Sequence, residues 1–298
     1  MKKLLVMFIT LCMVAISQNL IAQEIPDTTL FRLITTDGNN YFGKIVDQDS
    51  VKVRFDAQNL GELTFPRSAI KLLEPIPTAR VISGKVWPPN TQSTRYFFAP
   101  NAYGLNKGEG YYQNVWVLFN QFSLGVTRNF SIGAGMVPLF LFAGAPTPIW
   151  IIPKLTFPVV KDKFQVGAGG LVGFVLGAEE AGFGILYGTL TVGSRDANAS
   201  LGLGYGFVAG EWAQNPMINF SAFARLSPKT YFVTENYFIP VEDENLLLLS
   251  AGFRSIINRV GIDYGLFMPF FPDQDFHIAF PWLGFTVPFN VKKSSQPK

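Results

Sequence analysis

The residues with the clearest potential for chemistry are four charged side chains in strand-like runs of the last third of the chain. A two-residue turn at 258–259 puts Arg254 opposite Asp263 on two neighbouring strands. Side chains in directly opposed positions have Cβ atoms about 4.5 to 5.5 Å apart, which suits a salt bridge. Arg225 and Glu235 lie on the two preceding runs. The pattern predicts a belt of alternating charge on one face of these strands.

A charge belt inside a barrel can serve two different purposes. It can set ion selectivity or form a constriction, or it can brace the interior of a filled barrel with ion pairs. Lys154 is also predicted to point inward and has no obvious partner, which favours a watery lumen. If Glu235 points inward, its neighbour Asn236 must face lipid unless a bulge intervenes.

Two acidic clusters lie between strand-like runs and are candidates for calcium binding. A dedicated calcium loop places its oxygen ligands at alternate positions, and neither cluster has that spacing. We therefore predict solvated acidic loops and no metal site. The clusters are Glu179 with Glu180, and Glu242 with Asp243 and Glu244.

The only histidine, His277, is a candidate base for a lipid hydrolase. Such an enzyme would also need a nucleophile and a paired acid, and neither can be assigned. The only cysteine, Cys12, lies in a segment that export would remove. The glycine-rich run 167–177 is not followed by the Lys-Ser/Thr of a phosphate loop. The sequence predicts neither an enzyme nor a cofactor.

The strands that must carry these residues are predicted from a period of two. Leu201, Leu203 and Tyr205 alternate with glycines, and similar patterns recur along the chain. This alternation is typical of barrel strands that face lipid on one side. The uncharged span 130–153 is long enough for a transmembrane helix, but its four prolines would break helical hydrogen bonds. Because lipid accepts only helices or closed barrels, the pattern predicts an all-β transmembrane antiparallel barrel.

The barrel is expected to have about twelve strands. An even number returns both chain ends to one side of the membrane, which we expect to be the periplasm. Short and mostly basic turns would lie on that side, with the acidic loops opposite. The expected strands span 111–119, 121–127, 130–142, 148–159, 164–176, 182–194, 199–210, 217–226, 230–240, 246–256, 260–268 and 276–289.

The rest of the chain divides into smaller parts. Residues 1–23 have the basic pair, apolar run and polar end of a secretory signal peptide. Residues 24–76 are richer in charge and are predicted to form a small β module. Residues 77–110 contain turn signals without alternation and are interpreted as a connecting segment, and a polar tail, 291–298, follows the barrel at 111–290. The module's expected strands are 30–36, 40–47, 51–56, 61–65 and 70–74, with a helical turn at 66–69.

Composition excludes several classes of protein. Charged residues make up 15% of the chain, against about 25% in typical soluble domains. A soluble antiparallel sandwich also alternates, but its loops should carry more charge. The net charge of +3 comes without a basic cluster, so nucleic acid is a poor candidate partner.

Three stretches resemble known kinds of protein. The module, with a helical turn before its fifth strand, resembles an SH3-like or Sm-like small barrel, which implies fold only. The last strand alternates apolar residues up to Phe289 and resembles the insertion signal of outer-membrane barrels, although a polar tail follows. Residues 95–112 (RYFFAPNAYGLNKGEGYY) and 125–135 (GVTRNFSIGAG) look like an uncharacterised family of exported barrel proteins of Gram-negative bacteria. That resemblance implies fold and location, without a known activity.

These observations favour a small pore or transport protein of the outer membrane with a charged lumen, whose N-terminal module lies in the periplasm. The alternative is a structural anchor whose module binds peptidoglycan or a periplasmic protein. An outer-membrane lipid hydrolase ranks third. The expected partners are outer-membrane lipid and the barrel assembly machinery.

Overall fold

The computed structural model describes most of the chain after residue 29. The predicted signal peptide and polar tail lie outside the described residues, as do the acidic clusters at 179–180 and 242–244 and the histidine at 277. The chain divides into two compact units, with the boundary between residues 89 and 90. The described residues are 30–58, 60–76, 81–82, 85–87, 90–178, 182–240, 245–257, 259–271 and 278–289.

The N-terminal unit contains a five-stranded antiparallel sheet in the order β4-β3-β2-β1-β5. A short 3-10 helix, η1 (Arg67–Ala69), precedes the last strand, as the sequence predicts. Leu33, Phe55 and Ala57 form the buried core. A separate two-stranded pair, β6 (Val81–Ile82) and β7 (Lys85–Val86), follows the sheet. The five strands are β1 (Leu30–Thr35), β2 (Asn40–Gln48), β3 (Lys52–Ala57), β4 (Gly61–Pro66) and β5 (Ile70–Ile76).

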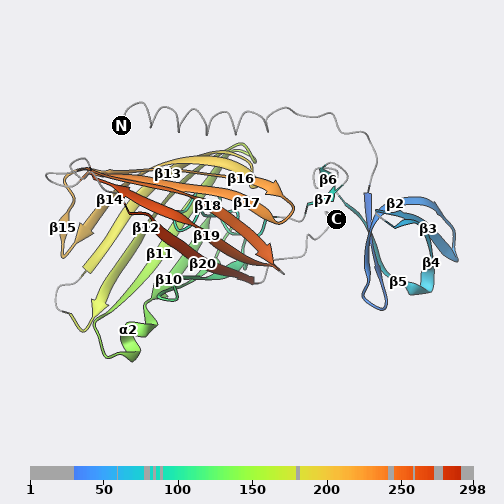
Figure 1. Cartoon of the computed structure of the whole chain (residues 1–298), viewed down its shortest axis with the longest axis horizontal. Helices are drawn as coiled ribbons and strands as arrows, with labels where there is room; N and C mark the ends of the chain where they lie inside the picture. The colour runs from blue at the N-terminus through green and yellow to red at the C-terminus, as the bar shows by residue number, and fades with distance from the viewer. Residues whose placement is uncertain are drawn as a thin grey trace. The chain divides into compact units, whose positions relative to one another are not determined.

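The second unit is a closed antiparallel barrel of twelve strands, which confirms the predicted fold class (Figure 1). Each strand pairs with its neighbours along the chain, and the first, β8, pairs with the last, β20. A two-residue strand, β15 (Glu211–Trp212), extends one loop. The twelve strands are β8 (Gly110–Val115), β9 (Phe119–Gly125), β10 (Phe130–Met136), β11 (Thr147–Val160), β12 (Phe164–Leu176), β13 (Gly182–Gly193), β14 (Ala197–Val208), β16 (Met217–Ser227), β17 (Thr230–Pro240), β18 (Asn245–Ile257), β19 (Val260–Phe270) and β20 (Phe280–Phe289).

The two faces of the barrel wall differ in the way that a period of two predicts. On β14, Leu201, Leu203 and Tyr205 are exposed outward, while Gly202 and Gly204 are buried inward. The same alternation gives the barrel an outer surface of large apolar side chains around its circumference. Examples from other strands are Phe122, Ile151, Phe174, Leu190, Leu266 and Leu283.

The structure departs from the predicted strands at the loop end of the barrel, which is the end that carries the β10–β11 and β12–β13 connections. The first strand stops at Val115 instead of residue 119, because Trp116 and Val117 adopt positive φ angles in a tight turn. The third stops at Met136, where Pro138 begins the short helix α2 (Pro138–Phe142). None of the helices among the described residues is both long and apolar enough to span a bilayer.

Candidate functional site

The lumen of the barrel is occupied by a stretch of chain that the sequence interpretation assigned to a connecting segment. Residues 90–105, here called the inner segment, run through the interior just before β8. Tyr96 and Phe97 in this segment have no exposed surface, and Asn101 is equally buried. The segment has almost no secondary structure, with one isolated bridge between Arg95 and Pro100. Its backbone polar groups therefore depend on the barrel for hydrogen-bond partners.

Arg95 enters a buried ion cluster on the barrel wall. Arg254 and Asp263 are register partners on β18 and β19, and Arg254 Nε donates to Asp263 Oδ1 at 2.5 Å. The other carboxylate oxygen, Oδ2, accepts from Arg95 Nη1 at 3.0 Å. All three side chains are nearly inaccessible to solvent. One carboxylate thus holds two guanidinium groups, one from the wall and one from the inner segment.

Two cations of the predicted belt, Arg254 and Lys154, also bind the backbone of the inner segment. Arg254 Nη1 donates to the carbonyl oxygen of Gln92 at 2.9 Å, and its Nη2 donates to that of Tyr96. Lys154 Nζ, from β11 across the lumen, donates to the carbonyl oxygens of Thr94 at 3.1 Å and Tyr103 at 2.7 Å. These side chains supply the donors that an irregular segment lacks.

Glu235 accepts hydrogen bonds from the backbone of the inner segment, whereas the cations donate to it. Its Oε2 accepts from the backbone N–H groups of Phe98 and Ala99 at 2.8 and 2.9 Å, and its Oε1 accepts from Tyr237 Oη at 2.7 Å. The carboxylate therefore contacts the inner segment and not an arginine of the wall. Three hydrogen bonds meet on this one carboxyl group, two of them from the backbone of the inner segment, so Glu235 is a main point of attachment.

Asn236, the outward-facing neighbour of Glu235, fits into the wall without a β-bulge. Asn236 and Thr234 are both buried in the wall. The Asn236 amide donates to the carbonyl oxygen of Phe220 on β16 and accepts from the N–H of Ser250 on β18. Thr234 Oγ1 donates to the carbonyl oxygen of Ser250. At this level of the barrel, side chains make hydrogen bonds that backbone groups make elsewhere between neighbouring strands. Asn236 therefore presents little polar surface to the outside.

Arg225 is placed differently from the other members of the belt. It lies at the turn end of β16 and forms a salt bridge of 3.1 Å with Asp196, whose side chain is 45% exposed. Its guanidinium also lies 5.3 Å from the centre of the Tyr231 ring. Arg225 therefore secures the turn end of the wall, and the charged residues do not form one continuous ring.

Aromatic side chains fill one side of the lumen. Phe97 of the inner segment packs against Phe267 and Trp282, with ring centres 5.6 Å apart in both cases. Tyr96 packs against Phe223, and Phe223 against Tyr231. These residues belong to one buried hydrophobic cluster, whose members on the barrel wall lie mainly on β16–β20. We call this side of the barrel, formed by β16–β20, the packed wall.

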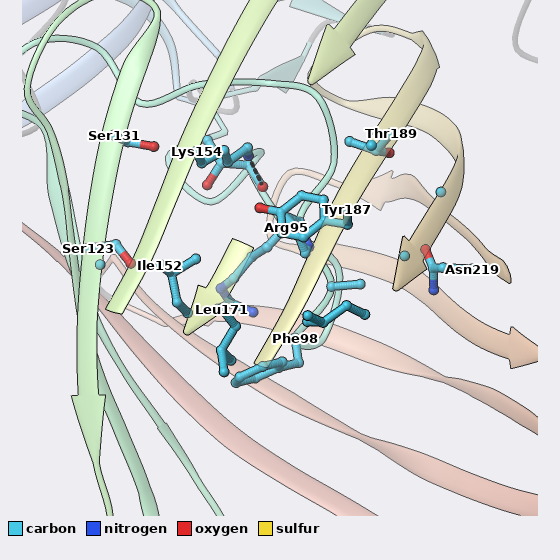
Figure 2. A pocket seen from close by; sticks show the side chains of 18 of the residues that line it. Arg95, Phe98, Ser123, Ser131, Ile152, Lys154, Leu171, Tyr187, Thr189 and Asn219 are labelled. Atoms are coloured by element: carbon cyan, nitrogen blue, oxygen red, sulfur yellow. Dashed lines mark hydrogen bonds between the residues drawn. The ribbon is translucent and has the colours of Figure 1, made fainter. Parts of the chain in front are cut away.

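A cavity of about 170 Å³ lies on the other side of the inner segment. The strands there, β9–β14, carry several inward glycines, and we call them the glycine wall. The cavity lining is mainly apolar, with Phe98, Leu105, Ile152, Leu171 and Ile185 among its residues. Figure 2 shows Lys154 and Tyr187 directed toward one another, with Thr189 farther away on the same strand as Tyr187.

Two polar groups of the cavity lining have no partner within the described part of the chain. The hydroxyl oxygens of Tyr187 and Thr189, both on β13, are buried and make no hydrogen bond there. Gly169 on the neighbouring strand leaves room for this arrangement, since a Cβ atom at Gly169 would lie 2.5 Å from Tyr187 Oη. The backbone of β12 thus permits the tyrosine to lie across it.

Sequence reasoning identified the charged side chains of the wall but not what they bind. The pattern that could have revealed the inner segment is its composition, because Tyr96, Phe97, Phe98 and Tyr103 are large aromatic residues in a stretch interpreted as a linker. Large aromatic side chains are typical of buried positions. No family model matches the chain, and no curated protein matches it.

Proposed function

We propose that the protein is a β-barrel of a Gram-negative-type outer membrane, and that it is a gated conduit for small solutes that the inner segment closes at rest. The membrane assignment is supported by the outward apolar side chains on nearly every strand of the barrel. Contiguous apolar patches on soluble proteins rarely exceed a few hundred Å², whereas a lipid-facing barrel needs such a surface.

The observation that carries the gating proposal is the way in which the inner segment is attached. Polar side chains of the wall bind its backbone at separate points, at Glu235, Arg254 and Lys154. Each hydrogen bond to a charged group contributes about 1.5 to 3 kcal/mol, and no regular secondary structure ties the segment to the strands. A twelve-stranded barrel is wider than the eight-stranded barrels that side chains alone can fill. Release of the segment would therefore open a passage.

A permanently open pore is not supported, because the same belt residues that would select ions are bonded to the inner segment. A structural anchor is the second candidate, and the packed wall favours it, since Phe97, Phe267 and Trp282 pack as a core does. In that case the module would bind peptidoglycan or a periplasmic protein. For a lipid hydrolase no supporting contact exists among the described residues, as His277 lies outside them.

Planar-bilayer recordings separate these candidates. Replacement of residues 92–104 by a Gly-Ser linker of equal length should convert a silent wild-type barrel into one with large, stable conductance steps. An equally long replacement at 77–89 serves as the control and should stay silent. Steady conductance of the wild type would overturn closure by the inner segment, and a silent 92–104 replacement that still folds would favour the anchor.

The location has its own test. A membrane barrel should fractionate with the outer membrane and migrate differently on gels before and after boiling. Recovery of the exported protein in the soluble fraction would overturn the proposal, including its gating part.

A further inference from the structure

The lining of the cavity beside the glycine wall includes two basic side chains, Arg95 and Lys154, and no acidic one among the described residues. Lys154 is 7% exposed, and no carboxylate of the described residues lies within 4 Å of its Nζ; its two hydrogen bonds go to the neutral carbonyls of Thr94 and Tyr103. Arg95, which also lines the cavity, shares the single carboxylate of Asp263 with Arg254. A buried ammonium group without a counter-ion is costly, and a bound anion would supply the counter-ion that Lys154 lacks among the described residues.

Hydrogen-bond donors stand next to this charge. Ammonium groups have three protons, and two of those on Lys154 are used. The hydroxyl groups of Tyr187 and Thr189 are buried without partners among the described residues. Because buried polar groups in folded proteins are nearly always paired, two such hydroxyls in one cavity indicate a group that the chain itself does not supply.

Most of the remaining lining is apolar, although Gln121, Ser123, Ser131 and Asn219 also border the space. Phe98, Leu105, Ile152, Leu171, Ile185 and Met217 surround the space. A volume of about 170 Å³ is close to that of an engineered apolar cavity that binds benzene. The ligand body is therefore apolar and comparable in size to one aromatic ring or a short acyl chain.

We propose that this cavity binds a small monocarboxylate with an apolar body, whose carboxylate accepts hydrogen bonds from Lys154 Nζ and Tyr187 Oη. A small monocarboxylate would then be the solute that the proposed conduit carries, and only this transport step rests on the conduit proposal. Binding itself is a property of the folded barrel, and the two can fail separately.

The test uses benzoate and its neutral isostere benzamide as probes. Titration calorimetry on the full chain in a neutral detergent should give benzoate at least about tenfold tighter binding than benzamide, the effect of one charge-assisted hydrogen bond. Tyr187→Phe should weaken benzoate binding by about tenfold and leave benzamide little changed. Tyr205→Phe, the same substitution on an outward residue of β14, is the matched control and should bind benzoate as the wild type does.

Lys154→Met, compared with Lys161→Met in an exposed turn, should remove the preference for benzoate over benzamide. Lys154 also holds the inner segment, so Tyr187→Phe is the decisive variant: its hydroxyl bonds to no described residue, and its removal should not lower the unfolding temperature of the ligand-free protein. Absence of benzoate binding, equal affinity for both probes, or unchanged benzoate affinity in Tyr187→Phe would each overturn the proposal. None of these outcomes bears on conductance after replacement of residues 92–104, which tests the conduit alone.

Discussion

The two walls of the lumen use the same alternating strands to opposite effect. Inward positions of the packed wall carry Phe223, Tyr231, Phe267 and Trp282, which pack against the inner segment. Inward positions of the glycine wall include Gly133, Gly167, Gly202 and Gly204, and beside them lies the cavity. Both walls also have buried cations that bind inner-segment carbonyls. The difference shows that side-chain size at inward positions divides one barrel interior into a structural half and a half with space for a ligand.

The comparison is sharpest for the two cations, Arg254 on the packed wall and Lys154 on the glycine wall. Arg254→Met should lower the free energy of unfolding by about 3 to 5 kcal/mol, because it breaks one of the two ion pairs of Asp263 and leaves the carbonyl oxygens of Gln92 and Tyr96 without this donor. Lys154→Met should cost less than half as much, since Lys154 bonds only to neutral carbonyls and its removal also ends the burial of an unpaired ammonium group. Urea unfolding in lipid vesicles, followed by tryptophan fluorescence, measures both. Equal losses would contradict the distinction between the walls.

The strands and part of the ion cluster could be predicted from the sequence. Alternation and turn residues locate most strands to within a few residues, because both are local properties of the chain. The two-residue turn before Val260 likewise places Arg254 opposite Asp263. The contacts of Glu235, Lys154 and Arg254 with the inner segment could not be predicted, because that segment has no period and its bonds go from side chains to backbone across the lumen. Contacts of this kind produce no recognisable spacing of residues in the sequence.

Glycines provide a second comparison, with a smaller expected effect. A Cβ atom at Gly252 on the packed wall would lie 2.2 Å from the carbonyl oxygen of Tyr264, a backbone atom that cannot move freely. At Gly202 on the glycine wall the nearest atom would lie 3.5 Å away. Gly252→Ala should therefore destabilise the barrel by about 1 to 3 kcal/mol through overpacking.

Gly202→Ala is the matched variant and should change the free energy of unfolding by less than about 1 kcal/mol. The two alanine variants can be compared by the temperature at which each barrel loses its unboiled gel mobility. A lower temperature for Gly202→Ala than for Gly252→Ala would mean that the space beside the glycine wall is not available to an added side chain.

The smallest effect is expected where the inner segment meets the turn end of the glycine wall. Tyr103 Oη donates to the carbonyl oxygen of Gly193 at 2.5 Å, and the guanidinium of Arg195 lies 4.7 Å from the ring centre. Tyr103→Phe removes one hydrogen bond and keeps the ring contact, so it should cost about 1 kcal/mol of the free energy of unfolding at neutral pH.

The same tyrosine makes this contact sensitive to alkali, which separates its hydroxyl from the rest of the inner segment. Burial raises the pKa of Tyr103 to about 12, above the value near 10 of an unfolded tyrosine. The folded protein then binds more protons than the unfolded chain between these values, so the contribution of Tyr103 is complete below pH 10 and is lost as the pH rises through 12. Unfolding in urea at several pH values should show the difference between wild type and Tyr103→Phe shrinking over this range. A constant difference would show that the neutral Tyr103 hydroxyl does not hold the inner segment in place.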